Sequence, residues 1–421
     1  MPGPEAPATE PDGVRTLLGP RPEAPWTENL DAVAAAGPLP PFDAAVTGFL
    51  AALTHGILAD PAMRAHPALM AFAHALRPAA VADLAARHGE RRARGTVLHL
   101  APANVDTVFA HSWLLAALCG NAGLVRLSRR RGPGQDLLLA RIAAALADPA
   151  FTPVRARTLI LDQADHGPGP LARLSAACDL RVVWGGDAAV AAVRAVPLPP
   201  LAEDLAFPDR FSAALFDAAA VRDADGAALA GLARDFANDV VWFDQSACSS
   251  PRLLLWTGDA ATTDAARARF WPAVEARVAA MGWRLGPGAV VARLSALDAA
   301  AAAGRIGPVD GGTPAGVAGD RLMRVAVAGP LDADRRAAHP GLGVLFERRA
   351  DDVPAALAGF GPKDQTLVVF GMAPASVAAA VDGLGVRTID RIVPPGRALA
   401  FAPVWDGHDL MERFSRRIGR G

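Results

Sequence analysis

The sequence lacks tyrosine altogether and has a single lysine, Lys363, among its 421 residues. Without tyrosine there can be no Tyr/Lys proton-transfer pair, so the enzymes that depend on one are excluded. The chain also has no GxxxxGK segment and no GxGxxG segment after an expected strand. A Walker-type phosphate loop is therefore excluded, and a bound nucleotide is not held by the usual dinucleotide fingerprint.

Cysteine is scarce as well, with three residues in the whole chain. A small, odd number argues against a disulfide scaffold and for a reducing compartment, in which thiol chemistry is available. Forty-two basic residues against 43 acidic ones give a net charge of -1, which leaves no broad cationic field for nucleic acid or anionic lipid. The nine histidines show no metal-ligand spacing, so no metal site is expected.

No hydrophobic run is clean enough to predict a membrane span. The first 28 residues are rich in Pro, Glu and Ala and lack an apolar core, so no secretory signal is expected and we expect a cytoplasmic protein. The most apolar stretch, residues 107–125, is interrupted by His111, Ser112 and the Gly120-Asn121 pair. It is predicted to be a buried helix.

A content of 52% hydrophobic and 20% charged residues is typical of a globular chain of two or three domains. Helical periodicity over residues 44–91 is broken at Asp60-Pro61 and His66-Pro67. Strands are then predicted at 96–100, 124–127, 157–161, 180–184, 252–256 and 388–393, alternating with helices at 107–119, 135–146, 169–177, 227–238 and 264–281. This alternation predicts an α/β fold with parallel sheets covered by helices.

The pattern also predicts four regions along the chain. Residues 1–40 hold many prolines and little periodicity, which indicates a flexible N-terminal arm. The first alternating block covers residues 41–235 and the second covers residues 236–384. Residues 385–421 form a closing segment.

Cys248 is the strongest candidate for a nucleophile. It follows a helix-like segment, lies among small residues and precedes a strand. A thiol in such a loop can be accessible and flanked by backbone N–H groups, as a covalent nucleophile and its oxyanion require. A buried structural cysteine is about equally frequent in this position. For Cys119 and Cys178, core packing is the stronger interpretation.

Polar residues follow the ends of the next expected strands, and the loops at these ends line the ligand crevice of an open sheet. Asn104 could donate its amide to a developing oxyanion or cap the following helix. Arg126 could pair with a ribose or phosphate, whereas the run 129–131 of three arginines is more typical of a solvated turn. In Trp184-Gly-Gly-Asp187, glycines would let a cofactor approach the start of a helix.

Together these motifs resemble the acyl-CoA reductase family, typified by the reductase component of the bacterial bioluminescence fatty acid (long-chain acyl-CoA) reductase, within the aldehyde dehydrogenase superfamily. The resemblance extends from about residue 90 to the end. It is carried by GNAGLVRLS (120–128), RVVWGGD (181–187), FDQSACSSP (243–251) and DRIVPPGRALAFAPVWDG (390–407). FDQSACSSP is the most specific of the four.

The resemblance implies an aldehyde dehydrogenase-like fold of two parallel-sheet α/β domains with the active site in the cleft between them. Residues 41–235 would be the NADP(H)-binding domain and residues 236–384 the catalytic domain. Residues 385–421 would return to pack on the core or on an oligomer interface. The resemblance also implies that the protein forms a homo-oligomer and has a partner protein that activates or transfers acyl groups.

The same resemblance implies the functions of individual residues. Cys248 matches the cysteine that takes the acyl group, and Asn104 matches the asparagine that supports the thioester oxyanion. Arg126 matches a basic residue near the adenosine ribose, and residues 184–186 match the turn near the nicotinamide of NADPH. The implied cofactor-binding residues are Pro102, Arg126, Ser128, Trp184, Gly185 and Gly186.

Such enzymes pass an acyl group, here expected to be fatty, from acyl-CoA to cysteine and reduce it to the aldehyde. In oxidising aldehyde dehydrogenases a general-base glutamate opens a Glu-Leu-Gly-Gly-Lys-Ser type segment. The similar stretch here, residues 207–212, has no acid at its head, although Glu203 and Asp204 are near in sequence. A missing base favours reduction or thiolysis over hydrolysis.

Two other functions share parts of this pattern. A cysteine acyltransferase or hydrolase would use the same nucleophile without nicotinamide, and a non-catalytic scaffold for an acyl-activating partner would bind neither ligand. Lys363, His339 and His408 could take part in proton transfer, but a solvated turn for the lysine and surface or packing positions for the histidines are the stronger interpretations.

Overall fold

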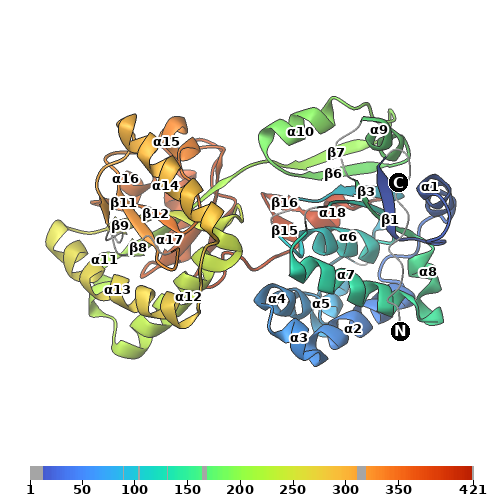
Figure 1. Ribbon diagram of the computed structural model, residues 1–421, viewed down its shortest axis with the longest axis horizontal. Coiled ribbons are helices and arrows are strands. Elements are labelled where there is room, and N and C mark those ends of the chain that lie inside the picture. Colours follow the sequence, from blue (N-terminus) through green and yellow to red (C-terminus); the bar gives the residue numbers. More distant parts are fainter. Residues whose placement is uncertain are drawn as a thin grey trace. The chain divides into compact units, whose positions relative to one another are not determined.

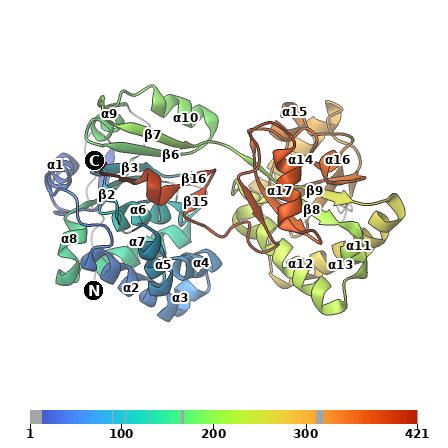
Figure 2. The same ribbon diagram turned by 180° about the vertical axis from the view of Figure 1, so that it is seen from behind.

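The structure is a computed structural model that describes residues 13–88, 90–102, 105–129, 131–163, 168–310 and 319–419. The chain forms two compact units, which Figures 1 and 2 show from opposite sides. The described parts of Met1–Asp209 and Phe401–Gly421 form unit one, and those of Arg210–Ala400 form unit two. Among these residues no single helix is long and apolar enough to cross a membrane.

Unit one is built on a six-stranded sheet with the strand order β1-β5-β4-β3-β6-β7. Its strands are β1 (Val14–Leu18), β3 (Thr96–Leu100), β4 (Ala122–Ser128), β5 (Thr158–Gln163), β6 (Leu180–Trp184) and β7 (Glu203–Phe207). Neighbouring strands are parallel except β1, which runs antiparallel to β5. The predicted parallel sheet is therefore confirmed, with one antiparallel strand at its edge.

The helices of unit one begin where the sequence supplies caps and prolines. They are α1 (Trp26–Ala35), α2 (Ala44–Ala59), α3 (Pro61–Arg64), α4 (Pro67–Ala75), α5 (Pro78–His88), α6 (Val108–Leu118), α7 (Pro133–Leu146), α8 (Thr152–Arg155), α9 (Pro168–Ala176), α10 (Asp187–Arg194) and α18 (Leu410–Arg413), with a 3-10 turn at Pro149–Phe151. The predicted break at Asp60-Pro61 is confirmed, because the Asp60 side chain caps α3 and the proline takes its first position.

Two layers of helices cover the sheet of unit one. Leu98 and Leu100 pack in one core with residues of α1, α9 and α10. The alternate residue, His99, faces the other way and bonds to Ser112 of α6, so α6 lies on the opposite face, as Figure 1 shows. The sheet is buried on both faces, as expected for parallel strands.

The expectation of a flexible arm over residues 1–40 is wrong for the described residues 13–40. Strand β1 pairs with β5, and Trp26, Leu30 and Val33 of α1 are buried in the core. Asn29 is also fully buried, and its amide bonds to the backbone of residues 21–25. The prolines lie in the loops around these short elements, which hides their periodicity in the sequence.

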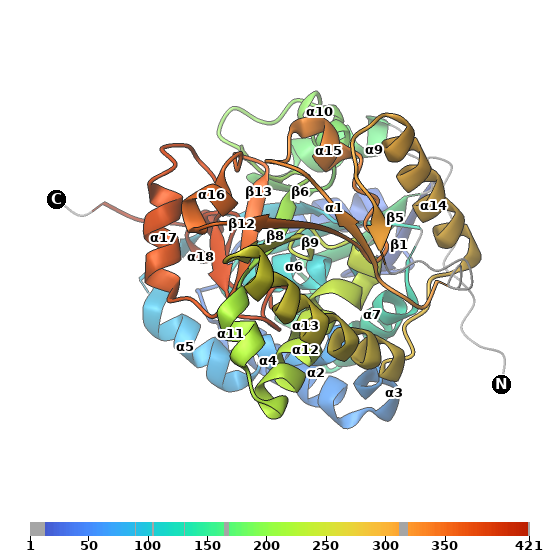
Figure 3. The ribbon, with the colours of Figure 1, turned by 90° about the vertical axis from the view of Figure 1, so that its left-hand side faces the viewer.

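Unit two contains a seven-stranded sheet with the order β10-β11-β12-β9-β8-β13-β14. Its strands are β8 (Phe211–Asp217), β9 (Pro251–Thr257), β10 (Val309–Asp310), β11 (Met323–Ala326), β12 (Val344–Ala350), β13 (Asp364–Phe370) and β14 (Arg391–Val393). The strands are parallel except β10. Many of its strands and helices are labelled in Figure 3.

Alternate residues of the unit-two strands enter two separate cores. Phe216 and Trp256 pack with α11, α12 and α13, whereas Leu215 and Leu255 pack with α14, α16 and α17 (Figure 3). The helices are α11 (Ala218–Asp223), α12 (Gly226–Val241), α13 (Ala260–Ala280), α14 (Pro287–Ala302), α15 (Ala333–Ala337), α16 (Val353–Leu357) and α17 (Pro374–Asp382), with a 3-10 segment η2 at Trp242–Gln245.

The boundaries between the units differ from the predicted ones. The first lies at Asp209/Arg210 rather than after residue 235, because β8 is an inner strand of the unit-two sheet. Residues 385–400 stay in unit two, where β14 pairs with β13. From residue 401 the chain returns to unit one, where β15 (Val404–Trp405) pairs with β16 (His408–Asp409) and β17 (Ser415–Arg416) pairs with β2 (Arg92–Ala93).

Candidate active-site elements

The carboxyl ends of β3, β4 and β6 meet at one edge of the unit-one sheet. Leu100 is paired with Arg126 on one side and with Val183 on the other. The Ala101 N–H donates to the Arg126 carbonyl at 3.2 Å. Because the chain moves from β3 to β4 on one side and β6 lies on the other, the direction of winding reverses here. This is the position at which open α/β sheets bind ligands.

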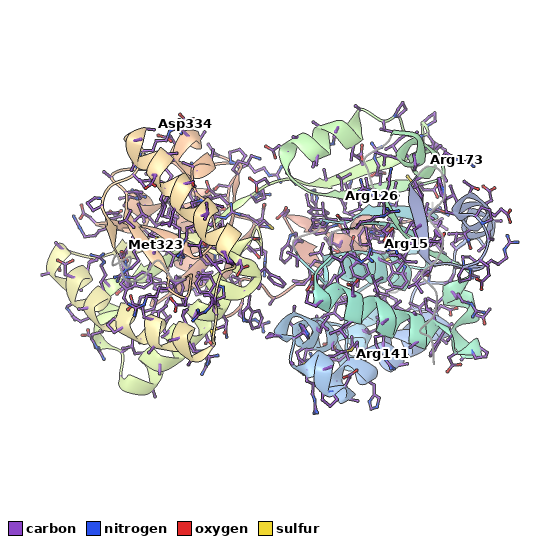
Figure 4. The ribbon with its side chains drawn as sticks, viewed as in Figure 1. Arg15, Arg126, Arg141, Arg173, Met323 and Asp334 are labelled. Atoms are coloured by element: carbon purple, nitrogen blue, oxygen red, sulfur yellow. The ribbon has the colours of Figure 1, made fainter. Side chains whose placement is uncertain are left out.

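The predicted cofactor residues gather at this edge. Pro102 follows β3, Arg126 and Ser128 end β4, and Gly185 and Gly186 follow β6. Arg126 is half-buried, and desolvation lowers the pKa of its guanidinium. Figure 4 labels Arg126 and Arg15 in unit one. Asn104, the predicted oxyanion donor, lies outside the described residues.

The Trp184 side chain is part of the packing. It is 8% exposed, and its ring stacks on Phe207 at a centroid distance of 3.9 Å and an angle of 14°. Its indole N–H donates to the Ser112 hydroxyl at 3.3 Å, which also bonds to Nδ1 of His99 at 2.8 Å. Only the backbone of this turn is left to approach a cofactor.

Gly185 and Gly186 leave room beside that backbone. A Cβ atom added at Gly186 would meet no heavy atom within 4 Å, and one at Gly185 would meet only the Ala189 Cβ, at 3.4 Å. Gly186 is also the residue before α10, whose N-terminus favours anionic groups. The protein's own packing therefore does not require these glycines, and the open space fits the close approach of a nucleotide.

Arg129 and Arg131, from the run of three arginines, form ion pairs as well as facing solvent. Arg129 and Arg131 pair with Asp162 at 3.3 and 2.7 Å, and Arg15 binds the same carboxylate. Asp162 is wholly buried at the end of β5. Burial would raise its pKa, but the hydrogen bonds and charges of Arg15 and Arg131 outweigh burial and lower it. This network fixes the edge strand β1 and the loop after β4.

Cys248 lies in a turn at the amino end of β9 in unit two. The neighbouring residues Ala247, Ser249 and Ser250 are buried, whereas Cys248 is partly exposed. The Ser212 hydroxyl donates to the Cys248 carbonyl at 2.7 Å, which fixes the turn against β8. The side chain is thus outside the core while its backbone is held, as a nucleophile requires.

The other two cysteines belong to the core, as the sequence predicted. Cys119 and Cys178 are each 3% exposed. Burial raises the pKa of both thiols to about 12. Neither forms appreciable thiolate at neutral pH, so neither can compete with Cys248 as a nucleophile.

The backbone before Cys248 has an unusual conformation that sequence reasoning missed. Phe243, Asp244 and Gln245 all have positive φ, at 55°, 49° and 60°. The facing segment Gly341-Leu342-Gly343 is also left-handed, and the Leu342 N–H donates to the Asp244 carbonyl at 3.1 Å. Three successive non-glycine residues in this region cost about 1–2 kcal/mol each. Such conformations cluster at functional sites. In the sequence, the two glycines of residues 341–343 are the feature that indicates left-handed backbone in this region.

The two acids closest in sequence to the segment that lacks a general base form ion pairs with arginines. Glu203 pairs with Arg94 at 2.6 Å and Arg413 at 3.3 Å, and Asp204 pairs with Arg181 at 2.7 Å. Both lie on β7 of unit one. Their positions give them structural partners and do not restore the base that the sequence lacks.

The three candidates for proton transfer lie in the surface or packing positions that were the stronger interpretations of the sequence. Lys363 is exposed. His339 is buried, its Nδ1 accepts from the Gly341 N–H at 3.0 Å, and burial lowers its pKa to about 3. His408 is half-buried with its ring against the edge of Phe207.

Comparison with known proteins supports the resemblance seen in the motifs. Residues 79–277 match the family described as acyl-CoA reductase (LuxC). This range contains Asn104, Arg126, residues 184–186 and Cys248. Among curated proteins, none matches the chain significantly.

Solved structures with similar folds are aldehyde dehydrogenases. The chain aligns with KauB from Pseudomonas aeruginosa at 13% identity and a TM-score of 0.67, covering 96% of this chain and 92% of that one. For aldehyde dehydrogenase 21 from Physcomitrella patens the values are 13%, 0.66, 94% and 90%. For the NAD+ complex of the Mycobacterium tuberculosis aldehyde dehydrogenase they are 15%, 0.64, 97% and 94%. The chain therefore has the aldehyde dehydrogenase fold, and the resemblance to the acyl-CoA reductases is confirmed over residues 79–277, a range that contains the first three motifs but not the fourth at 390–407.

Proposed function

We propose that the protein reduces an acyl thioester, a fatty acyl-CoA in the first instance, to the aldehyde with NADPH, through an acyl group carried on Cys248. The family match supports an oxidoreductase of the acyl-CoA reductase or aldehyde dehydrogenase type. The observation that carries the finer proposal is the partly exposed Cys248 in a turn whose neighbours are buried. The proposal assigns cofactor binding to unit one and acyl transfer to unit two.

In the first half of the reaction, the Cys248 thiolate attacks the thioester carbonyl. A new S–C bond forms, the CoA thiolate leaves and takes up a proton, and the acyl group stays on Cys248. The developing oxyanion would be stabilised by backbone N–H groups of the Cys248 turn and by the Asn104 amide. Loss of one such donor typically slows a reaction about 100- to 1,000-fold.

Bound NADPH would supply the hydride that converts the acyl thioester on Cys248 to a thiohemiacetal. The open backbone at Gly185 and Gly186 and the half-buried Arg126 are the residues that would hold it. Collapse of the thiohemiacetal releases the aldehyde and returns the thiol. Glu203 and Asp204 of β7 are each engaged by an arginine, so neither carboxylate is available to activate water. This favours release of the aldehyde over hydrolysis of the acyl-enzyme.

The test is NADPH oxidation, with aldehyde trapping, when a panel of acyl-CoAs of different chain lengths is added. Cys248→Ala should abolish both NADPH oxidation and covalent labelling by acyl-CoA. Cys119→Ala is the matched control. Because the Cys119 thiol is buried, removing it should leave turnover unchanged. Labelling without NADPH oxidation would indicate an acyltransferase or hydrolase. Full turnover of the Cys248→Ala variant would refute the proposal.

A further inference from the structure

The Gln245 side chain closes the segment that contains Cys248. It is fully buried, and its amide nitrogen donates to the Pro251 carbonyl at 2.7 Å and to the Val344 carbonyl at 2.8 Å. Its amide oxygen accepts from the Gly343 N–H at 3.0 Å. One side chain therefore joins both ends of the segment 245–251 and ties them to the start of β12.

The same contacts oppose an unfavourable backbone. Gln245 has a φ of 60° and ends the run of three left-handed residues that begins at Phe243. Asp244, in the same run, is also held by a side-chain contact: its carboxylate accepts from the Trp283 indole N–H at 2.9 Å. The strained backbone persists because these partners over-determine it. Without them the segment would be expected to relax and move the thiol.

We propose that Gln245 is the positioning residue of the Cys248 nucleophile, acting through the closed segment 245–251 rather than by contact with substrate. The inference rests on the proposed function, because both of its tests measure acyl transfer. A displacement of about 1 Å at a reacting group can cost about 100-fold in rate. The expected effect is therefore on acyl transfer and not on substrate affinity.

The first test is Gln245→Ala in the full-length protein. Acyl-enzyme formation and kcat, both expressed per folded molecule, should fall about 10- to 100-fold, while KM for acyl-CoA changes less than about 3-fold. Alkylation of Cys248 by iodoacetamide, which requires no fixed geometry, should change less than about 3-fold. Cys119 and Cys178 are buried, so alkylation of the native protein reports on Cys248.

The second variant, Gln245→Glu, keeps the shape of the side chain. Its carboxylate would face the Pro251 and Val344 carbonyl oxygens, so only the protonated form can donate to either of them. Its deficit in acyl transfer relative to wild type should therefore shrink as pH falls. This pH profile also decides the question if the alanine variant does not fold.

Asn121 provides the matched control in unit one. Its side chain is also buried, and its amide accepts from the Arg94 and Gly95 N–H groups and donates to the Ala116 and Phe414 carbonyls. Asn121→Asp should lower stability without producing the pH-dependent loss of acyl transfer. The inference is overturned if folded Gln245 variants transfer acyl groups at the wild-type rate with the wild-type pH profile. Wild-type protein that takes no acyl group would instead overturn the proposed function.

Discussion

The two candidate regions are built in opposite ways. At the carboxyl edge of the unit-one sheet, regular strands end side by side, and the glycines after β6 have open space beside their backbone. At the amino edge of the unit-two sheet, Cys248 is held by an irregular, left-handed backbone that a buried amide stabilises. The first region leaves open space beside the backbone of Gly185 and Gly186. The second fixes one small group at the cost of local strain.

Thiol reactivity should separate the two units most sharply. Cys248 in the unit-two turn is expected to react with a small alkylating reagent at pH 8 at least about 100-fold faster than Cys178 before β6. Burial explains the difference, because it raises the pKa of Cys178 to about 12. Mass spectrometry of the modified peptides measures both rates, and all three thiols should react once the chain is unfolded. Equal rates in the native protein would remove the distinction between the regions.

A pair of glycine substitutions sharpens the same comparison. Gly343→Ala, in unit two, should lower the free energy of unfolding by about 2–4 kcal/mol. Its φ is 74°, and an added Cβ would lie 2.4 Å from the Trp283 ring. Gly186→Ala, in unit one, should change stability by less than about 1 kcal/mol, because the space is open. Denaturant unfolding measures both values.

The Gly186→Ala variant also tests the cofactor position. If NADPH lies against this turn, the added methyl group should raise KM for NADPH about 10-fold while stability and thiol alkylation stay unchanged. An unchanged KM would show that the open space at Gly186 is not used by the cofactor.

The last comparison between the units concerns acid sensitivity. Burial lowers the pKa of His111 in unit one to about 3. The unfolded chain therefore binds a proton near pH 6.5 that the folded chain refuses, so stability falls between about pH 6.5 and 3, by about 1.4 kcal/mol per pH unit for each such histidine. His111→Phe should reduce the pH dependence of stability by one bound proton, because phenylalanine does not titrate. The replacement ring can keep the packing of His111 against Phe72 and Phe401.

Its counterpart in unit two is His339, whose pKa is lowered to the same degree. His339→Phe should also reduce the slope, but with a loss of stability at neutral pH of about 1–3 kcal/mol, because the Gly341 N–H loses its acceptor. Urea unfolding at several pH values measures both. Identical losses at neutral pH would contradict the difference in bonding.

The sequence was sufficient for the regular part of the fold. The strands predicted at 96–100 and 180–184 coincide with β3 and β6, because short buried runs between clear turn signals have few alternatives. It was insufficient where tertiary contacts decide. β8 follows Arg210 and directly adjoins a helix, so the sequence pattern does not separate it from that helix and predicts the boundary at residue 235 instead. In β1 and α1, buried residues lie between prolines.

For the candidate site, sequence patterns located the residues but not their conformations. The small residues around Cys248 indicated an accessible loop, and the described turn agrees. Nothing in Phe243-Asp244-Gln245 announces three positive φ angles, since none of them is glycine. Likewise, the partner that Arg129 and Arg131 share, Asp162, lies on β5 about 30 residues away in sequence, and only the folded chain brings the three together.

The two crossings of the chain between the units bear on how the protein is made. Unit two is encoded between the parts of unit one, and residues 401–419 follow it in synthesis. Strand β2 cannot pair, and the Asn121 amide cannot meet the Phe414 carbonyl, until that last piece leaves the ribosome. The two units therefore differ in the order in which they can be completed: the contacts of unit one with residues 401–419 can form only after the whole of unit two has been synthesised.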